Sequence, residues 1–428
     1  MSVAPEFPPR CLPSIGALIL GLWSFPIFQA QSLAADPDPA ATSGSPLPSD
    51  PVFSALRVDG NIVLGRLKQI GSKGEISIVP LKGAEETIRF GEIVKLTREG
   101  FFPNTSPTGS LVLFPNGDRL YRTVIGAAGE TSIEVQSYAL EHLSIPLDSI
   151  LGLVLNLPDD NSLVSSLIDR VRFEPRNSEI LLLRNGDKMT GGFLGLEEKK
   201  IKFQASAGPI SLERAGILAL GFDPSLVVYP EANEDGAFDL SLADGSRLGV
   251  KGVRIEQGQI TATTRFGAKI RVPLNEVIRI HARSTAISYL SERAETAVRY
   301  VGYVGPTRPY RRDESVDGQP LKLGGQVYDR GLGTQSRTIL AYRMSPGDRR
   351  FQAIVGLDDA AGPLGSVVFR VLVDGREVFA TPAMSVRDTP RPIDVEIAGG
   401  KLLILVTEFG ERGEVRDFAD WIEARILR

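Results

Sequence analysis

Cysteine and histidine, two of the residues most used in enzyme chemistry, are nearly absent from this chain of 428 residues. The sequence holds one cysteine, Cys11, and two histidines, His142 and His281. If a signal peptide containing Cys11 is removed, disulfides, thiolate nucleophiles and cysteine–metal sites are excluded together. No His-Glu metal motif, glycine-rich phosphate loop or Gly-x-Ser-x-Gly elbow accompanies the histidines. The sequence therefore favours a protein that binds rather than one that catalyses.

The chain also lacks an excess of positive charge. Its formal net charge is −4, which gives no electrostatic reason to expect nucleic acid as a partner.

One apolar run, Ile15–Phe28, follows Arg10, and Ser32 and Ala34 fit the small-residue positions of a cleavage site. We predict a signal peptide over residues 1–34, with an uncleaved anchor as the alternative. The run is short for a membrane span, so we expect none after cleavage. The predicted location is secreted, or in the periplasm or cell envelope.

Residues 35–51 follow as a proline-rich segment. The stretch Asp36–Pro51 reads DPDPAATSGSPLPSDP, which offers almost no large apolar side chain for a core. We predict a disordered linker.

Four turns that pair Asn or Asp with Gly organise the next part of the chain. Each turn, centred on Gly60, Gly117, Gly186 or Gly245, lies between two candidate strands and is followed by a second strand pair. Asn-Gly and Asp-Gly suit the positive-φ positions of a tight hairpin. Self-similarity at this period predicts four copies of one β unit.

The copies fall into two predicted segments, residues 52–158 with copies one and two, and residues 159–283 with a helix and copies three and four. The helix is predicted from apolar residues at helical spacing between Asn161 and Val171, and it should pack one pair of copies against the other. Each unit weakly resembles an Sm-like or SH3-like small β-barrel. Larger sheets or propeller-like blades are the alternatives.

Residues 285–428 show a different β pattern. Val367, Phe369, Val371 and Val373 alternate with other residues before the turn Asp374-Gly375. Alternation that ends in Asp-Gly is typical of a strand entering a hairpin. The pattern predicts an all-β sandwich.

This segment also resembles the NPCBM family of carbohydrate-binding modules. The motifs that carry the resemblance occur in the family's order: Tyr328, Gly331-Leu332-Gly333, Val355–Asp359, Gly365–Phe369 and Asp420-Trp421. The resemblance implies a galactose-binding-like jelly roll that binds a glycan. Gln335 stands where the family usually has histidine, which puts a ligand role at that position in doubt.

Sugar sites combine an aromatic face with planar hydrogen-bonding side chains. Six of the nine tyrosines lie between Tyr289 and Tyr342, with arginines among them. The candidate carbohydrate-binding residues are Tyr310, Tyr328, Arg337 and Arg387. Trp421 is expected to be buried in the sandwich instead.

Asp358 and Asp359 follow a predicted strand and are the candidate metal ligands. The resemblance to galactose-binding-like folds implies a calcium ion, which carboxylates suit. The alternative is a loop whose carboxylates accept backbone N–H bonds.

Together these features predict an exported, mainly β, non-catalytic carbohydrate-binding protein, with a four-copy β array followed by a jelly roll. The first alternative is a structural or protein-interaction component of the cell envelope, in which the array contacts protein partners. The second is a glycoside-processing enzyme.

Overall fold

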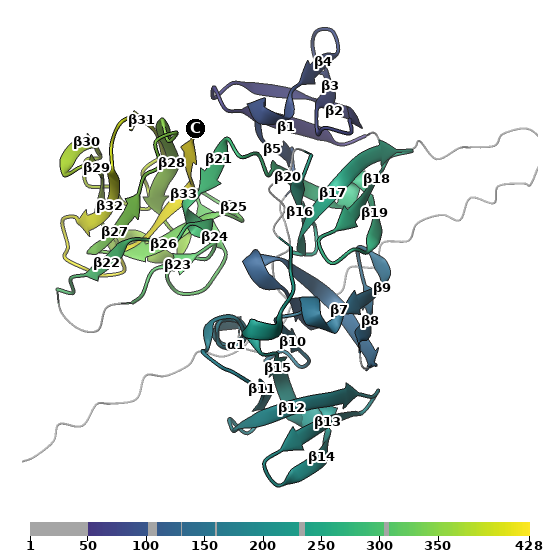
Figure 1. Cartoon of the computed structure of the whole chain (residues 1–428). Helices are drawn as coiled ribbons and strands as arrows, with labels where there is room; N and C mark the ends of the chain where they lie inside the picture. Colours follow the sequence, from purple (N-terminus) through teal and green to yellow (C-terminus); the bar gives the residue numbers. More distant parts are fainter. Residues whose placement is uncertain (1–49, 102–108, 130, 159–160, 231–235, 304–307) are drawn as a thin grey trace, which may run out of the picture. The chain divides into compact units, whose positions relative to one another are not determined.

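The computed structural model describes residues 50–101, 109–129, 131–158, 161–230, 236–303 and 308–428. The predicted signal peptide and nearly all of the predicted linker lie outside these residues. Within them, no helix is long and apolar enough to cross a membrane. The chain folds as four small β units followed by a β-sandwich (Figure 1), which confirms the predicted fold class.

The strands of the array repeat in sets of five. Copy one contains β1 (Val52–Arg57), β2 (Ile62–Ile70), β3 (Ile76–Pro80), β4 (Glu86–Ile88) and β5 (Ile93–Arg98). Copy two contains β6 (Ser110–Leu113), β7 (Arg119–Ala128), β8 (Ser132–Ser137), β9 (Glu141–Pro146) and β10 (Gly152–Val154). Copy three contains β11 (Glu179–Leu183), β12 (Lys188–Leu196), β13 (Lys200–Ala205), β14 (Gly208–Glu213) and β15 (Ile217–Gly221). Copy four contains β16 (Phe238–Leu242), β17 (Arg247–Glu256), β18 (Gln259–Thr264), β19 (Lys269–Pro273) and β20 (Val277–Ala282).

All four copies share one topology. In copy one the pairing order is β4-β3-β2-β1-β5, and the other three copies repeat it. The last strand of every copy also pairs with the last strand of another copy. The glycines at 60, 117, 186 and 245 have φ between 78° and 92°, a conformation that glycine adopts without a Cβ penalty. The second strand of every copy carries a bulge where it pairs with the third. These matching irregularities show that the four turns occupy equivalent positions.

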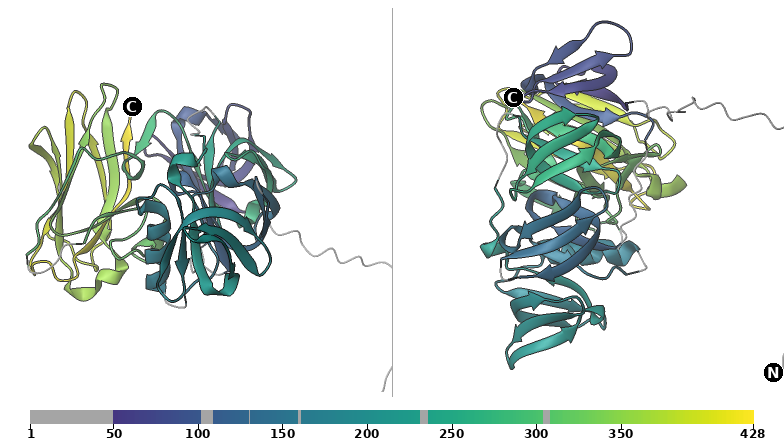
Figure 2. Two further views of the ribbon diagram at one scale, coloured as in Figure 1. Left: turned by 60° about the horizontal axis from the view of Figure 1, so that its bottom comes forward. Right: turned by 90° about the vertical axis from the view of Figure 1, so that its right-hand side faces the viewer.

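The copies associate in an order that differs from their order along the chain. The last strands pair across copies, β5 with β20 and β10 with β15, so copy one joins copy four and copy two joins copy three. The second strands of copies two and four then meet at Arg119 and Arg247. Figures 1 and 2 show the resulting row of copies one, four, two and three.

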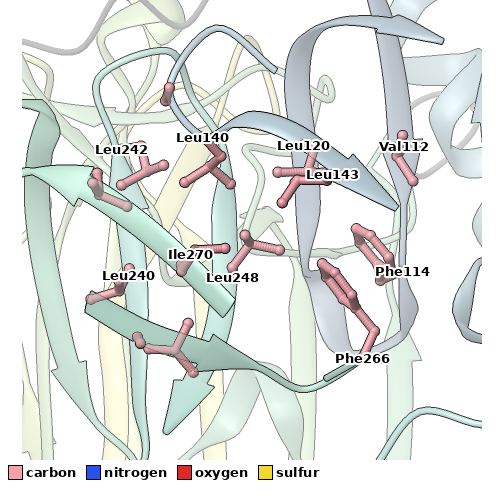
Figure 3. Packing of buried hydrophobic residues seen from close by; sticks show 14 of the residues in the cluster. Val112, Phe114, Leu120, Leu140, Leu143, Leu240, Leu242, Leu248, Phe266 and Ile270 are labelled. Atoms are coloured by element: carbon pink, nitrogen blue, oxygen red, sulfur yellow. The ribbon is translucent and has the colours of Figure 1, made fainter. Parts of the chain in front are cut away.

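Copies two and four also share a core. Figure 3 shows leucines of both copies around the stacked rings of Phe114 and Phe266, whose centroids are 5.1 Å apart. This contact joins the two halves of the array without a helix between them.

The predicted helix is α1 (Asn161–Phe173). Its apolar side covers the sheet that copies two and three build together, with Val164, Leu167, Ile168 and Val171 packed on strands β6, β10, β11 and β15. The helix was predicted to pack one pair of copies against the other, and it covers copies two and three, one from each predicted pair. The joint between copies two and four connects the pairs a second time without the helix. Its last turn carries Asp169, Arg172 and Phe173.

The C-terminal sandwich consists of two main sheets. One contains β23 (Arg311–Arg312), β26 (Gly331–Gln335), β33 (Phe418–Leu427), β28 (Arg350–Leu357) and β31 (Arg391–Glu396), with β21 (Ile287–Tyr289) also on β33. The other contains β22 (Ala297–Tyr300), β27 (Thr338–Arg343), β32 (Leu402–Phe409), β29 (Val367–Val373) and β30 (Arg376–Ala380). A small hairpin, β24 (Leu321–Leu323) and β25 (Gln326–Tyr328), completes the domain.

Trp421 lies at the centre of the sandwich core. It is fully buried, and its ring meets Phe369 edge-on at 5.2 Å between centroids. Its indole N–H donates to the hydroxyl of Thr407 on the opposite sheet at 3.0 Å. A buried indole needs such an acceptor, so Trp421 has the structural role that the sequence predicted.

The array and the sandwich meet through buried charges. Arg330 of the sandwich, fully buried, donates to Asp239 of copy four and to Glu292. Nearby, Arg247 of copy four lies 3.1 Å from Asp313. Pairing opposite charges in this way lowers the free-energy cost of burying them.

Candidate functional site

A cavity of about 760 Å³ lies where the last turn of α1 faces the loop before and after β23. We call it the Tyr310 pocket. Phe173 supplies an aromatic ring that is 66% exposed, and Tyr310 supplies a second, half-buried one. Polar side chains complete the wall: Asp169, Arg172, Glu295, Arg308, Arg311, Arg312, Glu314, Asp317 and Gln319. The pocket thus combines aromatic rings with planar hydrogen-bonding groups.

Ion pairs fix the wall of this pocket. Arg311 pairs with Asp169 of α1 and also lies 3.3 Å from Glu314. Arg312 pairs with Glu295 and donates from Nε to the Tyr310 hydroxyl at 3.1 Å. A guanidinium held in a network is already oriented, which reduces the entropy lost when it binds a further ligand.

Arg172 is a candidate donor for a ligand. Its Nε and one Nη are buried and have no hydrogen-bond partner in the described part of the chain. Burial and the nearby guanidinium of Arg119 lower the pKa of Arg172 below its ordinary value. An unpaired buried donor is costly, so a hydroxyl-bearing ligand that accepted from it would gain free energy.

Glu314 is the carboxyl with the most altered ionisation in this wall. Burial raises the pKa of Glu314 to about 7, although the nearby Arg172 and Arg311 oppose the shift. Glu314 therefore changes charge near neutral pH, and binding at the Tyr310 pocket should depend on pH.

The predicted binding residues do not form one site. Tyr328 lines a second cavity, of about 140 Å³, which shares Glu314 and Gln319 with the Tyr310 pocket. Its hydroxyl donates to Gln326 at 3.0 Å, and its ring packs on Leu321 and Leu323. The two tyrosines thus lie in adjoining cavities.

The two predicted arginines lie elsewhere. Arg337 forms an ion pair with Glu408 at 3.0 Å, and Arg387 is exposed in the segment between β30 and β31. Neither lines the Tyr310 pocket or the cavity at Tyr328. The structure therefore separates them from the tyrosines.

Asp358 and Asp359 hold the β24–β25 hairpin through backbone N–H groups. The carboxylate of Asp358 accepts from Lys322 and Ala360 at 3.0 and 2.8 Å. That of Asp359 accepts from Gly324 and Gly325 at 2.8 and 2.9 Å. All four oxygens therefore have a donor, which is the arrangement of a structural loop, and calcium binding by this pair stays a prediction.

Asp358 also lies beside Asp420, whose carboxyl is fully buried. Burial and the neighbouring Asp358 raise the pKa of Asp420 well above its ordinary value. Two carboxyl groups in contact cannot both ionise cheaply, so the pair shares a proton.

The ligand atoms of one further group of side chains are spaced closely enough to bind one metal ion. Among the described residues, His281, Asp329 and Glu423 place ligand atoms within 4.8 Å of one another. However, the ammonium of Lys95 is 2.9 Å from Glu423, and a guanidinium nitrogen of Arg279 is 3.6 Å from Asp329. These cations already neutralise the carboxylates. The group therefore belongs to the buried charges where the array and the sandwich meet, which we call the charged junction.

Comparison with known proteins finds similarity over the C-terminal sandwich. Residues 286–427 match the model of the NPCBM/NEW2 domain, as the sequence motifs predicted.

A Renibacterium salmoninarum protein named "Putative endo-alpha-N-acetylgalactosaminidase" is 32% identical over 111 residues, 26% of this chain and 7% of that protein. The chain therefore spans a small part of that relative's length.

Two solved structures from Clostridium perfringens are also similar. The CBM51 module of a GH95 protein, in complex with methyl-galactose, is 27% identical, with 33% of this chain and 99% of that chain covered and a TM-score of 0.30. The CBM51-2 and INT domains of ZmpB are 22% identical, with 42% and 40% covered and a TM-score of 0.31.

Sequence reasoning missed the contribution of α1 to the candidate site. Asp169 and Arg311, which pair across the pocket, are 142 positions apart in the chain. Helical periodicity predicted the buried side of α1, but it carries no information about what the last turn faces.

Proposed function

We propose that the chain is a non-catalytic carbohydrate-binding protein whose C-terminal domain binds a glycan at the Tyr310 pocket. The observation that carries the proposal is the pocket itself, in which two aromatic rings lie among arginine, carboxylate and amide side chains. The match of residues 286–427 to a carbohydrate-binding-module family supports it. The proposed location, secreted or in the periplasm or cell envelope, rests on the predicted signal peptide.

A glycan array probed with the full chain tests this function, with galactosides and cell-envelope glycans among its ligands. We expect binding to a subset of glycans. Tyr310→Phe, which keeps the ring and removes the hydroxyl between Arg312 and Glu295, should weaken binding, whereas Arg387→Ala should not. Absence of binding to any glycan on the glycan array would favour a structural role in the envelope with protein partners.

One observation favours a second function, glycoside hydrolysis. Glu314 has a raised pKa, as a general acid requires, and Asp169 shares Arg311 with it. Incubation of each bound glycan with the wild-type chain and with Glu314→Gln would distinguish the two functions. A glycan recovered intact supports binding alone, whereas cleavage that Glu314→Gln abolishes would establish an enzyme.

A further inference from the structure

The array ends in two copies whose outer faces differ in polarity. The relevant face is formed by alternate residues at the start of the second strand and at the end of the third strand or directly after it, and we call it the joint face. In copy one its residues are Ile62, Leu64, Val79 and Leu81, and in copy three they are Lys188, Thr190, Gln204 and Ser206. The registers establish this equivalence, since Ile62 pairs with Leu56 as Lys188 pairs with Leu182, and Arg66 pairs with Val79 as Gly192 pairs with Gln204.

Copies two and four use the same face to join each other. Arg119 of copy two and Arg247 of copy four are equivalent to Ile62, and these two residues are direct partners between β7 and β17. Tyr121 and Gly249 are equivalent to Leu64, and each contacts the turn of the other copy. The amide of Tyr121 donates to Ser246 Oγ, and the amide of Gly249 donates to a carboxylate oxygen of Asp118, both at 2.9 Å.

This internal joint is close to two-fold symmetric. Each copy places the start of its second strand on the turn of the other, and residue 119 pairs with its own equivalent, residue 247. An interface of that kind is self-complementary, so one copy's face can dock against an identical face.

Copy one leaves this face open and apolar. The exposed fractions of Ile62, Leu64, Val79 and Leu81 are 62%, 45%, 42% and 54%. Leu64 and Leu81 are neighbours across the β2–β3 pair, since the amide of Leu81 donates to the carbonyl of Leu64 at 3.0 Å. Repeat arrays need a polar outer face at their ends to stay soluble, and copy three has one. Copy one lacks it, and a contiguous apolar patch of this kind marks an interaction site.

We propose that copy one docks onto copy one of a second chain, with β2 against β2 in the antiparallel arrangement that β7 and β17 show. A second copy of this chain is the occupant that the internal joint favours, because the same face already closes on its own equivalent there. The four apolar side chains bring no like charges into contact, and Arg66, which lies on the same face, donates to the carbonyl of Asp50 at 3.3 Å. The product would be a two-fold dimer in which eight β units form one row.

Sedimentation velocity of the full chain across the micromolar range tests this proposal. Four apolar side chains form a small interface, so we expect a reversible dimer rather than a permanent one. Leu64→Lys with Leu81→Lys should raise the dissociation constant at least about tenfold. The matched control, Thr190→Lys with Ser206→Lys on copy three, should leave dimerisation unchanged.

Cross-linking tests the register. In a Cys11→Ser background, Ile62→Cys should form a disulfide-linked dimer on mild oxidation, because antiparallel partners have Cα atoms within disulfide range. Lys188→Cys, at the equivalent position of copy three, should remain monomeric.

Three results would overturn the proposal. They are a wild-type chain that stays monomeric at every concentration, a dimer that survives the double lysine substitution, and a dimer that disappears when residues 1–49 are removed. The last result would mean that the N-terminal segment, and not contact between two joint faces, holds the two chains together. Circular dichroism of each variant confirms that it is folded.

Discussion

The array and the jelly roll are both built from β strands, yet they differ in how their cores are held together. The array repeats one small unit and joins its copies strand to strand, so its core is spread over four similar parts. The jelly roll buries Trp421 with Tyr342, Phe351 and Phe369 between two sheets, and polar side chains of the loops around β23 line the Tyr310 pocket. A single substitution in the core of the jelly roll should therefore lower its stability more than a substitution at any one surface position lowers the stability of the array. The side chains that bind a ligand should lie on the loops of the jelly roll.

The largest effect is expected for Trp421→Ala. Removing a fully buried tryptophan leaves a cavity and leaves the Thr407 hydroxyl with Thr334 but without its indole donor, so the free energy of unfolding should fall by about 3–5 kcal/mol. Chemical denaturation measures the change. Tyr303→Ala, at a ring that is 71% exposed, is the control and should change stability little. Similar losses for the two variants would contradict the comparison.

Next in size is Arg330→Met at the charged junction. It removes the guanidinium that pairs with Asp239, which is buried, and with Glu292, whose side chain is 27% exposed. Breaking a buried pair typically costs about 3–5 kcal/mol, of which part returns because Arg283 also contacts both carboxylates. Lys68→Met, which removes an exposed pair with Glu85, should cost less than about 1 kcal/mol. Equal losses would show that the junction is not held by its charges.

Glu314→Gln should change the pH dependence of stability. Because the pKa of Glu314 in the folded protein is about 7, above its ordinary value of 4.5, the folded state keeps a proton that the unfolded state releases. The unfavourable contribution of Glu314 to the stability of the folded state therefore grows as pH rises from about 4.5 to about 7, and it is fully present above that pH. Relative to wild type, Glu314→Gln should be more stable at pH 8, by about 3 kcal/mol at most, and similar at pH 4. A difference that does not vary with pH would contradict the assignment.

The smallest effect concerns calcium. If Asp358 and Asp359 bind Ca²⁺, chelator should lower the melting temperature, excess Ca²⁺ should restore it, and Asp358→Asn should blunt the response. An identical calorimetric transition with chelator and with Ca²⁺ would leave the two aspartates as the anchors of the β24–β25 hairpin.

The sequence predicted the repeats, the helix, the sandwich and the burial of Trp421, because turn chemistry and periodicity are local properties. It could not predict that β5 pairs with β20, or that α1 supplies Phe173 and Asp169 to a pocket of the sandwich, because these contacts join distant segments. Tyr310 was predicted from the density of tyrosine and arginine around it. Arg337 and Arg387 were predicted on the same ground, and nothing in the sequence indicated that they lie apart from Tyr310.

The central claim is that the jelly roll binds a glycan at a pocket whose wall α1 completes. Calorimetric titration of the full chain with a glycan that it binds on the glycan array tests this claim most directly. The titration compares Phe173→Ala with Leu163→Ala, which change two exposed apolar residues of the same helix. We predict that Phe173→Ala weakens binding about tenfold, as expected for loss of an aromatic platform, while Leu163→Ala binds as wild type does. Equal affinity of the two variants would place the glycan elsewhere and contradict the claim.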